Sequence, residues 1–280
     1  MQYMKKYVQE ATDENIWTSI KNNTFGRNKD IKDFIDGLEL IDESACISLD
    51  AKWGDGKTFF VRQIEEVLKY VLANQRADEE NPIEKLPSYE YLKDNEMMAK
   101  IDLKHSYLPI YYNAWMYDNH SDPLMSLLLV MTKTCRGVYD TKIDSEKISK
   151  KLVEALATLP ISLGEFKANP FTAIEKLQGK SMDILSLVQT EEEIRERVKG
   201  IFNDIIVERA QKLVIFIDEL DRCRPSFAIE MLERIKHYFD DERVIFVVSL
   251  NKEQLIHTIT NYYGSGFDAT RYLNKFFDVN

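Results

Sequence analysis

The chain has 280 residues, a formal net charge of −10, 44% apolar residues and 30% charged residues. These values are typical of a globular protein that buries a sizeable core in one or two domains. The acidic balance excludes an overall basic surface, so binding to nucleic acid stays open only through a local patch. The longest apolar run, 124–131, is much shorter than the ~20 residues that cross a bilayer, so we expect no membrane association.

The cysteines and the N-terminus indicate the compartment. Cys46, Cys135 and Cys223 are widely separated, and their spacing gives neither a disulfide framework nor a zinc site. Residues 1–7 lack the apolar core of a signal peptide. We therefore expect a cytoplasmic protein.

The first part of the chain predicts one strand among helices. A polar segment up to Asn23 is expected to form a short helix, and apolar residues at helical spacing predict a second helix over 31–38. The apolar run 45–49 predicts the first strand, and the pattern over 60–71 predicts the helix that follows it. Residues 74–104 contain prolines and many charges, so we expect them to form an excursion from the core.

The rest of the chain predicts three further strands. Residues 108–113 form the second predicted strand, and Pro123 opens the helix after it. Residues 137–192 mix glycine, proline and charge clusters, and we interpret them as an inserted helical region. The apolar runs 213–217 and 244–248 predict strands that are buried on both faces, each followed by a helix. Strands that alternate with helices favour an α/β fold with a parallel sheet between two helical layers.

The most informative segment is 46–58, which predicts a strand, a glycine-bearing turn and the start of a helix. It ends in Gly-Lys-Thr, as a phosphate-binding P-loop does. Backbone N–H groups at such a helix N-terminus, together with the helix dipole, attract a phosphate chain. The predicted nucleotide contacts are Lys52, Trp53, Gly54, Asp55, Gly56, Lys57, Thr58 and Phe59.

Within this loop, Lys57 is expected to reach the β- and γ-phosphates of ATP, and the Thr58 hydroxyl is expected to bind Mg²⁺. Ala51 stands where the usual pattern has its first glycine. We expect the loop to tolerate this residue, because Gly54 and Gly56 remain and a negative φ at Ala51 accommodates its methyl group.

A second signal follows the strand predicted over 213–217. Asp218 lies at the carboxyl end of that strand, where an acid can hold Mg²⁺ beside the P-loop hydroxyl. Glu219 is placed to orient or deprotonate the attacking water. The alternative is a solvated acidic turn, but the P-loop on an earlier strand favours the catalytic interpretation. Asn251 ends the strand after Asp218, where it either senses the γ-phosphate, holds the water, or caps the next helix.

Four segments together resemble the KAP family of P-loop NTPases: 51–58, 113–123, 217–223 and 272–278. The resemblance spans roughly residues 20–280. It implies a single P-loop NTPase domain over 1–280, built as a three-layer αβα sandwich with a mainly parallel central sheet. In that core another strand separates the P-loop (Walker A) strand from the Asp218 (Walker B) strand. It also implies ATP with Mg²⁺, and a helical insertion between the two motifs.

The resemblance implies further site residues. The Phe25-Gly26-Arg27 segment resembles the stretch that lines the adenine pocket in related ATPases, which gives Arg27 a role in nucleotide binding. Arg271 lies just before 272–278, which looks like the last core strand. Related ATPase rings place an arginine that acts in trans near that point, so we give Arg271 a catalytic role.

Alternatives remain for this arginine. Arg222 and Arg224 follow the acidic pair in sequence and are rivals for the same role. A surface or structural ion pair is the alternative for all three. If a strand begins at Phe276, it ends unfinished, and an exposed incomplete strand is a liability, so we expect the chain to be C-terminally incomplete.

The leading hypothesis is an ATPase that couples nucleotide binding and hydrolysis to assembly or conformational switching. The expected partners are ATP and either further copies of the chain or an effector protein, and the family resemblance suggests bacterial anti-phage defence. A nucleotide-binding scaffold with little hydrolysis is the alternative. A kinase is disfavoured, because the sequence shows no arginine-rich lid for a second substrate.

Overall fold

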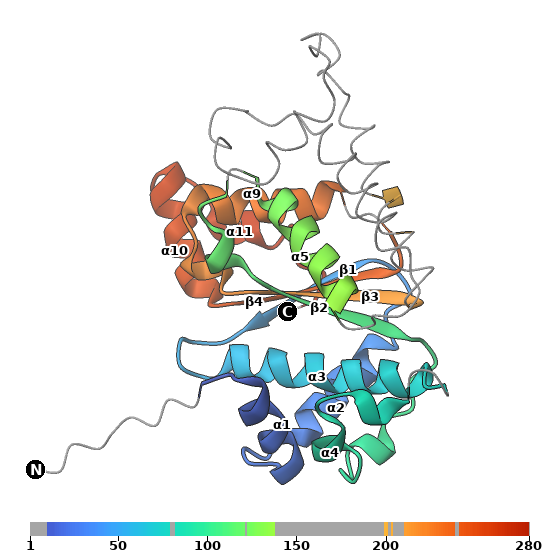
Figure 1. Cartoon of the computed structure of the whole chain (residues 1–280). Helices are drawn as coiled ribbons and strands as arrows, with labels where there is room; N and C mark the ends of the chain where they lie inside the picture. The colour runs from blue at the N-terminus through green and yellow to red at the C-terminus, as the bar shows by residue number, and fades with distance from the viewer. Residues whose placement is uncertain are drawn as a thin grey trace, which may run out of the picture.

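The computed structural model describes residues 10–78, 82–120, 122–137, 199–200, 203, 210–238 and 241–279. In this part of the chain, helices lie on both faces of one central sheet (Figure 1). The α/β fold predicted from the sequence is therefore confirmed. Beyond residue 137, the inserted helical region expected over 137–192 lies outside the described residues.

The sheet has four parallel strands: β1 (Ala45–Asp50), β2 (Tyr107–Asn113), β3 (Lys212–Asp218) and β4 (Val244–Leu250). Their spatial order is β1-β4-β3-β2, so β4 separates the P-loop strand from the strand that ends in Asp218. β3 and β4 are buried along their whole length, as their unbroken apolar runs require. The strands predicted over 45–49, 108–113, 213–217 and 244–248 are confirmed.

Two helical layers cover the sheet (Figure 1). On one face lie α1 (Asp13–Asn22), α2 (Asn28–Leu38) and α3 (Lys57–Gln75), and on the other lie α5 (Pro123–Gly137), α9 (Pro225–Tyr238), α10 (Lys252–Tyr263) and α11 (Ala269–Leu273). Side chains of β3 alternate between the two cores: Ile215 and Ile217 join the α5–α9–α10 side, whereas Val214 and Phe216 join the α3 side. The period of two along a strand thus divides one apolar run between two cores.

The segment after α3 corrects one expectation. Residues 74–104 were expected to leave the core, but their described part forms η1 (Ile83–Lys85), α4 (Tyr89–Leu92) and η2 (Met98–Lys100), and α4 packs against α1. Leu92, Met97 and Leu103 are buried in the same core as α1 and α2. The prediction followed the many charges of the segment and gave no weight to these three apolar residues, whose burial packs the segment against the core.

The C-terminal segment corrects a second expectation. The predicted core strand over 272–278 is wrong, because α11 continues to Leu273 and a turn follows. Asp268 starts this helix by accepting the Arg271 N–H at 2.9 Å, and Leu273, Phe276 and Phe277 are all buried, at helical rather than strand spacing. Pairing with β1 begins only at the end: Asp278 donates to Cys46, and Val279 bridges Ile47 in parallel.

Candidate functional site

The P-loop connects β1 to α3 at the carboxyl edge of the sheet. Gly54 and Gly56 have φ values of 93° and 80°, in the left-handed region that favours glycine. Asp55 Oδ2 accepts the Lys52 N–H at 3.0 Å and closes the turn. Ala51 donates its N–H to the Leu250 carbonyl at 3.2 Å, so the loop entry simply continues the pairing of β1 with β4.

Ala51 is compatible with this loop. Among the described residues, the non-glycine residues with positive φ are Asn23 and Glu219, so Ala51 keeps the negative φ that its methyl group requires. The residue that departs from the usual P-loop pattern thus stands where no glycine is needed.

The amino end of α3 carries the predicted phosphate and metal contacts. Lys57 Nζ donates to the carbonyls of Ala51 and Lys52, the latter at 3.1 Å, so the ammonium lies against the loop itself. Thr58 is half-buried in the first turn of α3. Phe59 differs: its side chain is buried in the α3-side core, edge-on to Phe25 with ring centroids 5.6 Å apart. Only the backbone of Phe59 therefore faces a ligand at the loop.

Arg27 lies directly on the P-loop. Its Nη2 donates to the Asp55 carbonyl at 2.8 Å and its Nη1 to the Gly56 carbonyl at 3.2 Å. A Cβ placed on Gly56 would meet this guanidinium at 3.3 Å. The structure thus brings the predicted Arg27 to the loop, where it binds two backbone carbonyl oxygens.

Asp218 is buried at the end of β3, with both carboxylate oxygens engaged. Tyr111 donates its hydroxyl to Oδ2 at 3.0 Å, and the Glu219 N–H is 3.0 Å from Oδ1. Burial, followed by the charge of Asp218, raises the pKa of Tyr111, so its hydroxyl stays a neutral donor. The guanidinium of Arg62, on α3, lies 4.8 Å from the centre of the Tyr111 ring. These contacts fix the orientation of the predicted metal-binding acid.

Glu219 has a left-handed backbone conformation, and each oxygen of its carboxylate contacts a neighbouring side chain. Its φ of 61° is in the left-handed region, which costs a non-glycine residue about 1–3 kcal/mol. Asn113, at the end of β2, donates Nδ2 to Oε2 at 3.2 Å, and Arg222 in η5 (Leu220–Arg222) lies 3.2 Å from Oε1. β2 pairs with β3 so that Asn113 is opposite Asp218, which explains why its amide reaches the next residue.

Two exposed tryptophans border this site. The Trp53 indole, on the P-loop, donates its N–H to Asp221 in η5, so the loop and the turn after β3 are in direct contact. Trp115 follows β2 in η3 (Ala114–Tyr117), and the Arg222 guanidinium lies 5.7 Å from the centre of its ring. Both indoles are 54% exposed. Both indoles therefore lie against the turn that follows the acidic pair.

The remaining predicted residues have other contacts. Asn251 caps α10, because its side chain accepts the Gln254 N–H at 3.1 Å, so the capping alternative is confirmed. Arg224 pairs with Asp118 at 3.2 Å, and Arg222 pairs with Glu219, as the ion-pair alternative expects. Arg271 is exposed on α11, and its side chain makes no hydrogen bond or ion pair among the described residues.

Sequence reasoning gave no role to three residues that build the site. Tyr111, Asn113 and Asp221 hold Asp218, Glu219 and Trp53, respectively. The available signal was position: Tyr111 and Asn113 end a predicted strand, and parallel strands bring their carboxyl ends to one edge. The register between β2 and β3, which the sequence does not reveal, decides which acid each residue meets.

Comparisons with known proteins give one family match and one relative. A model of the KAP family P-loop domain matches residues 27–280. An uncharacterized protein of Methanocaldococcus jannaschii is 26% identical to this chain over 173 residues, which is 51% of this chain and 89% of the relative. Among the described residues, no helix has both the length and the apolar character that a bilayer crossing requires.

Proposed function

Because the chain belongs to the KAP family of P-loop NTPases, we propose that it binds ATP with Mg²⁺ at the P-loop. We propose further that water attacks the γ-phosphate there, which releases ADP and inorganic phosphate. One observation carries this proposal: Trp53 of the P-loop bonds Asp221, so the turn that follows the acidic pair is in contact with the loop. This contact supports a single site for phosphate-binding and acidic groups, as phosphoryl transfer to water requires.

The residues present fit this ligand set. Positive φ at Gly54 and Gly56 opens the loop backbone next to the N-terminus of α3, which attracts phosphate. Lys57 is a mobile cation that can exchange two loop carbonyls for phosphate oxygens. Thr58 would ligate Mg²⁺ directly, and Asp218, already bonded at both oxygens, would hold its water shell. The bound ion would neutralise charge that develops on the phosphate oxygens.

Glu219 is the proposed base. A water that attacks phosphorus loses a proton, and a carboxylate within one hydrogen bond of that water accepts it. In the structure, Asn113 and Arg222 occupy one carboxylate oxygen each. Each oxygen can still accept a further hydrogen bond, but the two partners hold the side chain in place. We therefore assign this arrangement to a resting enzyme, in which Glu219 leaves at least one partner to reach the water.

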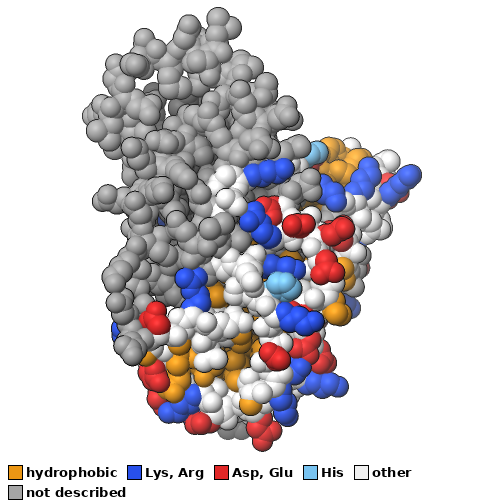
Figure 2. All heavy atoms as spheres, turned by 90° about the vertical axis from the view of Figure 1, so that its right-hand side faces the viewer, with side chains coloured by type: hydrophobic (Ala, Val, Ile, Leu, Met, Phe, Trp, Pro, Cys, Tyr) orange, Lys and Arg blue, Asp and Glu red, His pale blue; other side chains and the backbone are white. Residues whose placement is uncertain are grey.

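The contacts of Asn113 and Arg222 with Glu219 also favour the second candidate function, an ATP-binding scaffold that hydrolyses ATP rarely. In both cases the nucleotide state would control assembly, with further copies of the chain or with an effector protein. A role in anti-phage defence rests on the family resemblance alone. On the face drawn in Figure 2, basic and acidic side chains are interspersed, which favours a protein partner over nucleic acid there.

Steady-state phosphate release and ATP binding test the proposal together. Lys57→Ala is expected to lose both, and Glu219→Gln to bind ATP while losing turnover. Exposed residues provide matched controls, since Lys275→Ala and Glu84→Gln make the same chemical changes outside the site. Equal phosphate release by Glu219→Gln and the wild type would remove the proposed base. ATP binding without turnover in the wild type would select the scaffold.

A further inference from the structure

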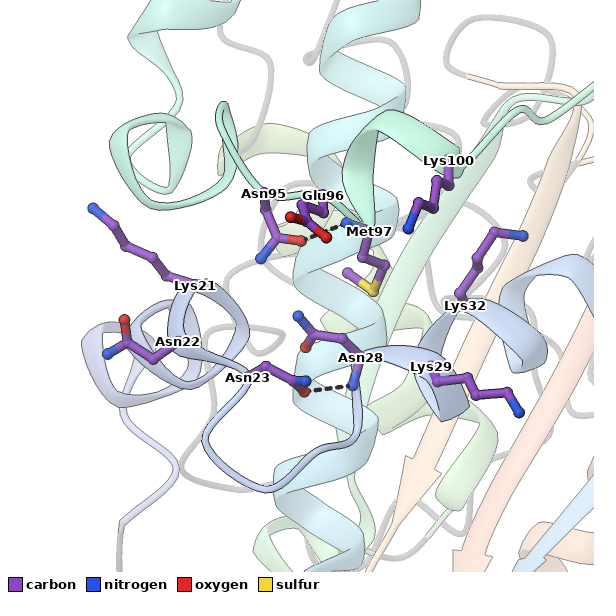
Figure 3. A pocket seen from close by; sticks show the side chains of 10 residues that line it. All are labelled: Lys21, Asn22, Asn23, Asn28, Lys29, Lys32, Asn95, Glu96, Met97 and Lys100. Atoms are coloured by element: carbon purple, nitrogen blue, oxygen red, sulfur yellow. Dashed lines mark hydrogen bonds between the residues drawn. The ribbon is translucent and has the colours of Figure 1, made fainter.

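A hollow of about 450 Å³ opens on the surface and is lined by residues outside the P-loop (Figure 3). It lies between the end of α1, the first turns of α2 and the segment around η2. Its lining residues are Lys21, Asn22, Asn23, Asn28, Lys29, Lys32, Asn95, Glu96, Met97 and Lys100. None of them belongs to the nucleotide contacts assigned above, so the hollow is a separate feature of the molecule.

The lining concentrates positive charge in an acidic protein. The lining includes four lysines from three elements and a single carboxylate, Glu96. Lys29 and Lys100 make no hydrogen bond or ion pair among the described residues, whereas Lys32 pairs with Asp36. Lys21 contacts the Glu90 carbonyl only at 3.5 Å. This excess of cations, in a chain with a net charge of −10, favours an anionic ligand.

The floor of the hollow is polar and held in place. Asn95 and Asn28 both donate their side-chain amides to the Ile20 carbonyl, at 2.8 and 2.9 Å. Asn23 accepts the Asn28 N–H at 3.1 Å, a bond drawn in Figure 3. These bonds connect α1, α2 and the loop before η2, so a ligand would meet a preformed surface rather than flexible side chains alone.

The first turn of α2 adds to the attraction. Asn23 already accepts the Asn28 N–H, so the contribution of this turn is the positive end of the helix dipole rather than a free first N–H group. A volume of 450 Å³ is in the range of small-molecule sites. We propose that this hollow binds a small molecule that carries two or more phosphate groups.

The hollow connects to the P-loop through one residue. Arg27 directly precedes Asn28, and its guanidinium binds the Asp55 and Gly56 carbonyls. A ligand that fixes the first turn of α2 therefore fixes Arg27 on the P-loop. This part of the inference rests on the proposed function: the ligand would regulate ATP binding at the loop.

Binding of inorganic tripolyphosphate, measured by calorimetry, tests the site without any turnover. The wild type is expected to bind two equivalents, one at each site, and Lys57→Ala to bind one. In the Lys57→Ala background, adding K21A, K29A and K100A is expected to weaken binding at least tenfold, and added salt to weaken it as well. The matched control adds K104A, K133A and K275A, which remove the same charge elsewhere, and is expected to bind like Lys57→Ala alone.

Several results would overturn the inference. These are no tripolyphosphate binding by Lys57→Ala, equal loss in the control set, or tighter binding of a single-stranded oligonucleotide than of tripolyphosphate to Lys57→Ala. Circular dichroism of each variant separates loss of the site from loss of the fold. Failure of the ATPase proposal would leave binding by Lys57→Ala unchanged, so the two proposals can fail independently.

Discussion

The indole N–H of Trp53 donates to the carboxylate of Asp221, so the P-loop is bonded to the turn that follows β3. These residues are 168 positions apart in the chain. The bond joins the proposed phosphate-binding part of the site to its acidic part, and three substitutions around this site give specific expectations.

Removing the indole donor should weaken ATP binding. Trp53→Phe keeps an aromatic ring but loses the N–H, and the loss of one hydrogen bond from this half-exposed indole corresponds to about 1 kcal/mol, or roughly fivefold in the dissociation constant. Asp221→Ala should give the same loss, and the double variant no more, as measured with a fluorescent ATP analogue. Asp221→Asn retains an acceptor oxygen and is the control. Additive losses in the double variant would show that the bond is not the cause.

Releasing Glu219 should raise basal turnover. Asn113→Ala removes one of the two groups that occupy its carboxylate. A hydrogen bond of about 1 kcal/mol limits the expected increase in kcat to roughly fivefold. Phosphate release at saturating ATP checks this, with Asn113→Ala/Glu219→Gln expected to be inactive. A rate that falls to that of Glu219→Gln would mean that Asn113 positions the base productively.

Tyr111→Phe should destabilise the fold more than Tyr112→Phe. Tyr111 donates to the buried carboxylate of Asp218, whereas the Tyr112 hydroxyl, on the opposite side of β2, shares a hydrogen bond with Ser126. A bond to a charged group is worth about 1.5–3 kcal/mol and a neutral one about 1 kcal/mol. Urea unfolding measures both free energies. Equal losses would mean that Asp218 gains little from its partner.

Cys46 should resist alkylation in the folded protein. Burial, followed by the charge of Asp278, raises the pKa of its thiol from 9.0 to about 12. At pH 8 the thiolate fraction is then lower than in the unfolded chain by about three orders of magnitude. A variant with Cys135→Ser and Cys223→Ser isolates this thiol for reaction with iodoacetamide. Equal rates with and without urea would contradict the expected burial.

The same shift predicts how stability depends on pH. Because the folded protein has the higher pKa, the stabilising contribution of the neutral thiol is fully present below pH 9 and is lost as the pH rises toward about 12. Cys46→Ala should therefore flatten the fall in unfolding free energy over that range. Urea unfolding at several pH values provides the measurement.

The sequence predicted the sheet well, because each strand is a short apolar run and the buried runs of β3 and β4 are unbroken. It also predicted the P-loop and the acidic pair, since their residue types and order are specific. The inward-facing residues of 82–104 and the helix α11 were missed. In both segments a few buried apolar residues determine the structure. The prediction for 82–104 followed its polar residues instead, and the prediction for the C-terminal segment assumed a strand.

Within the site, the contacts that hold Glu219 and Asp218 depend on distances across the sheet. Asn113 meets the acidic pair only because β2 and β3 pair in the observed register. A shift of one residue would turn the Asn113 side chain to the other face. Such registers are set by packing along both strands, and the strand pattern alone leaves them open.

The pairing of β1 has a consequence for how the protein is made. β1 pairs with β4, and Ala45 lies opposite Ile245, about 200 positions later. During synthesis, β1 is therefore translated long before β4, and it has no β4 partner until most of the chain has been made. Contacts of such high sequence separation form slowly. Nascent chains that end before Val244 should consequently leave Cys46 open to alkylation, whereas release of β4 should close the P-loop strand into the sheet.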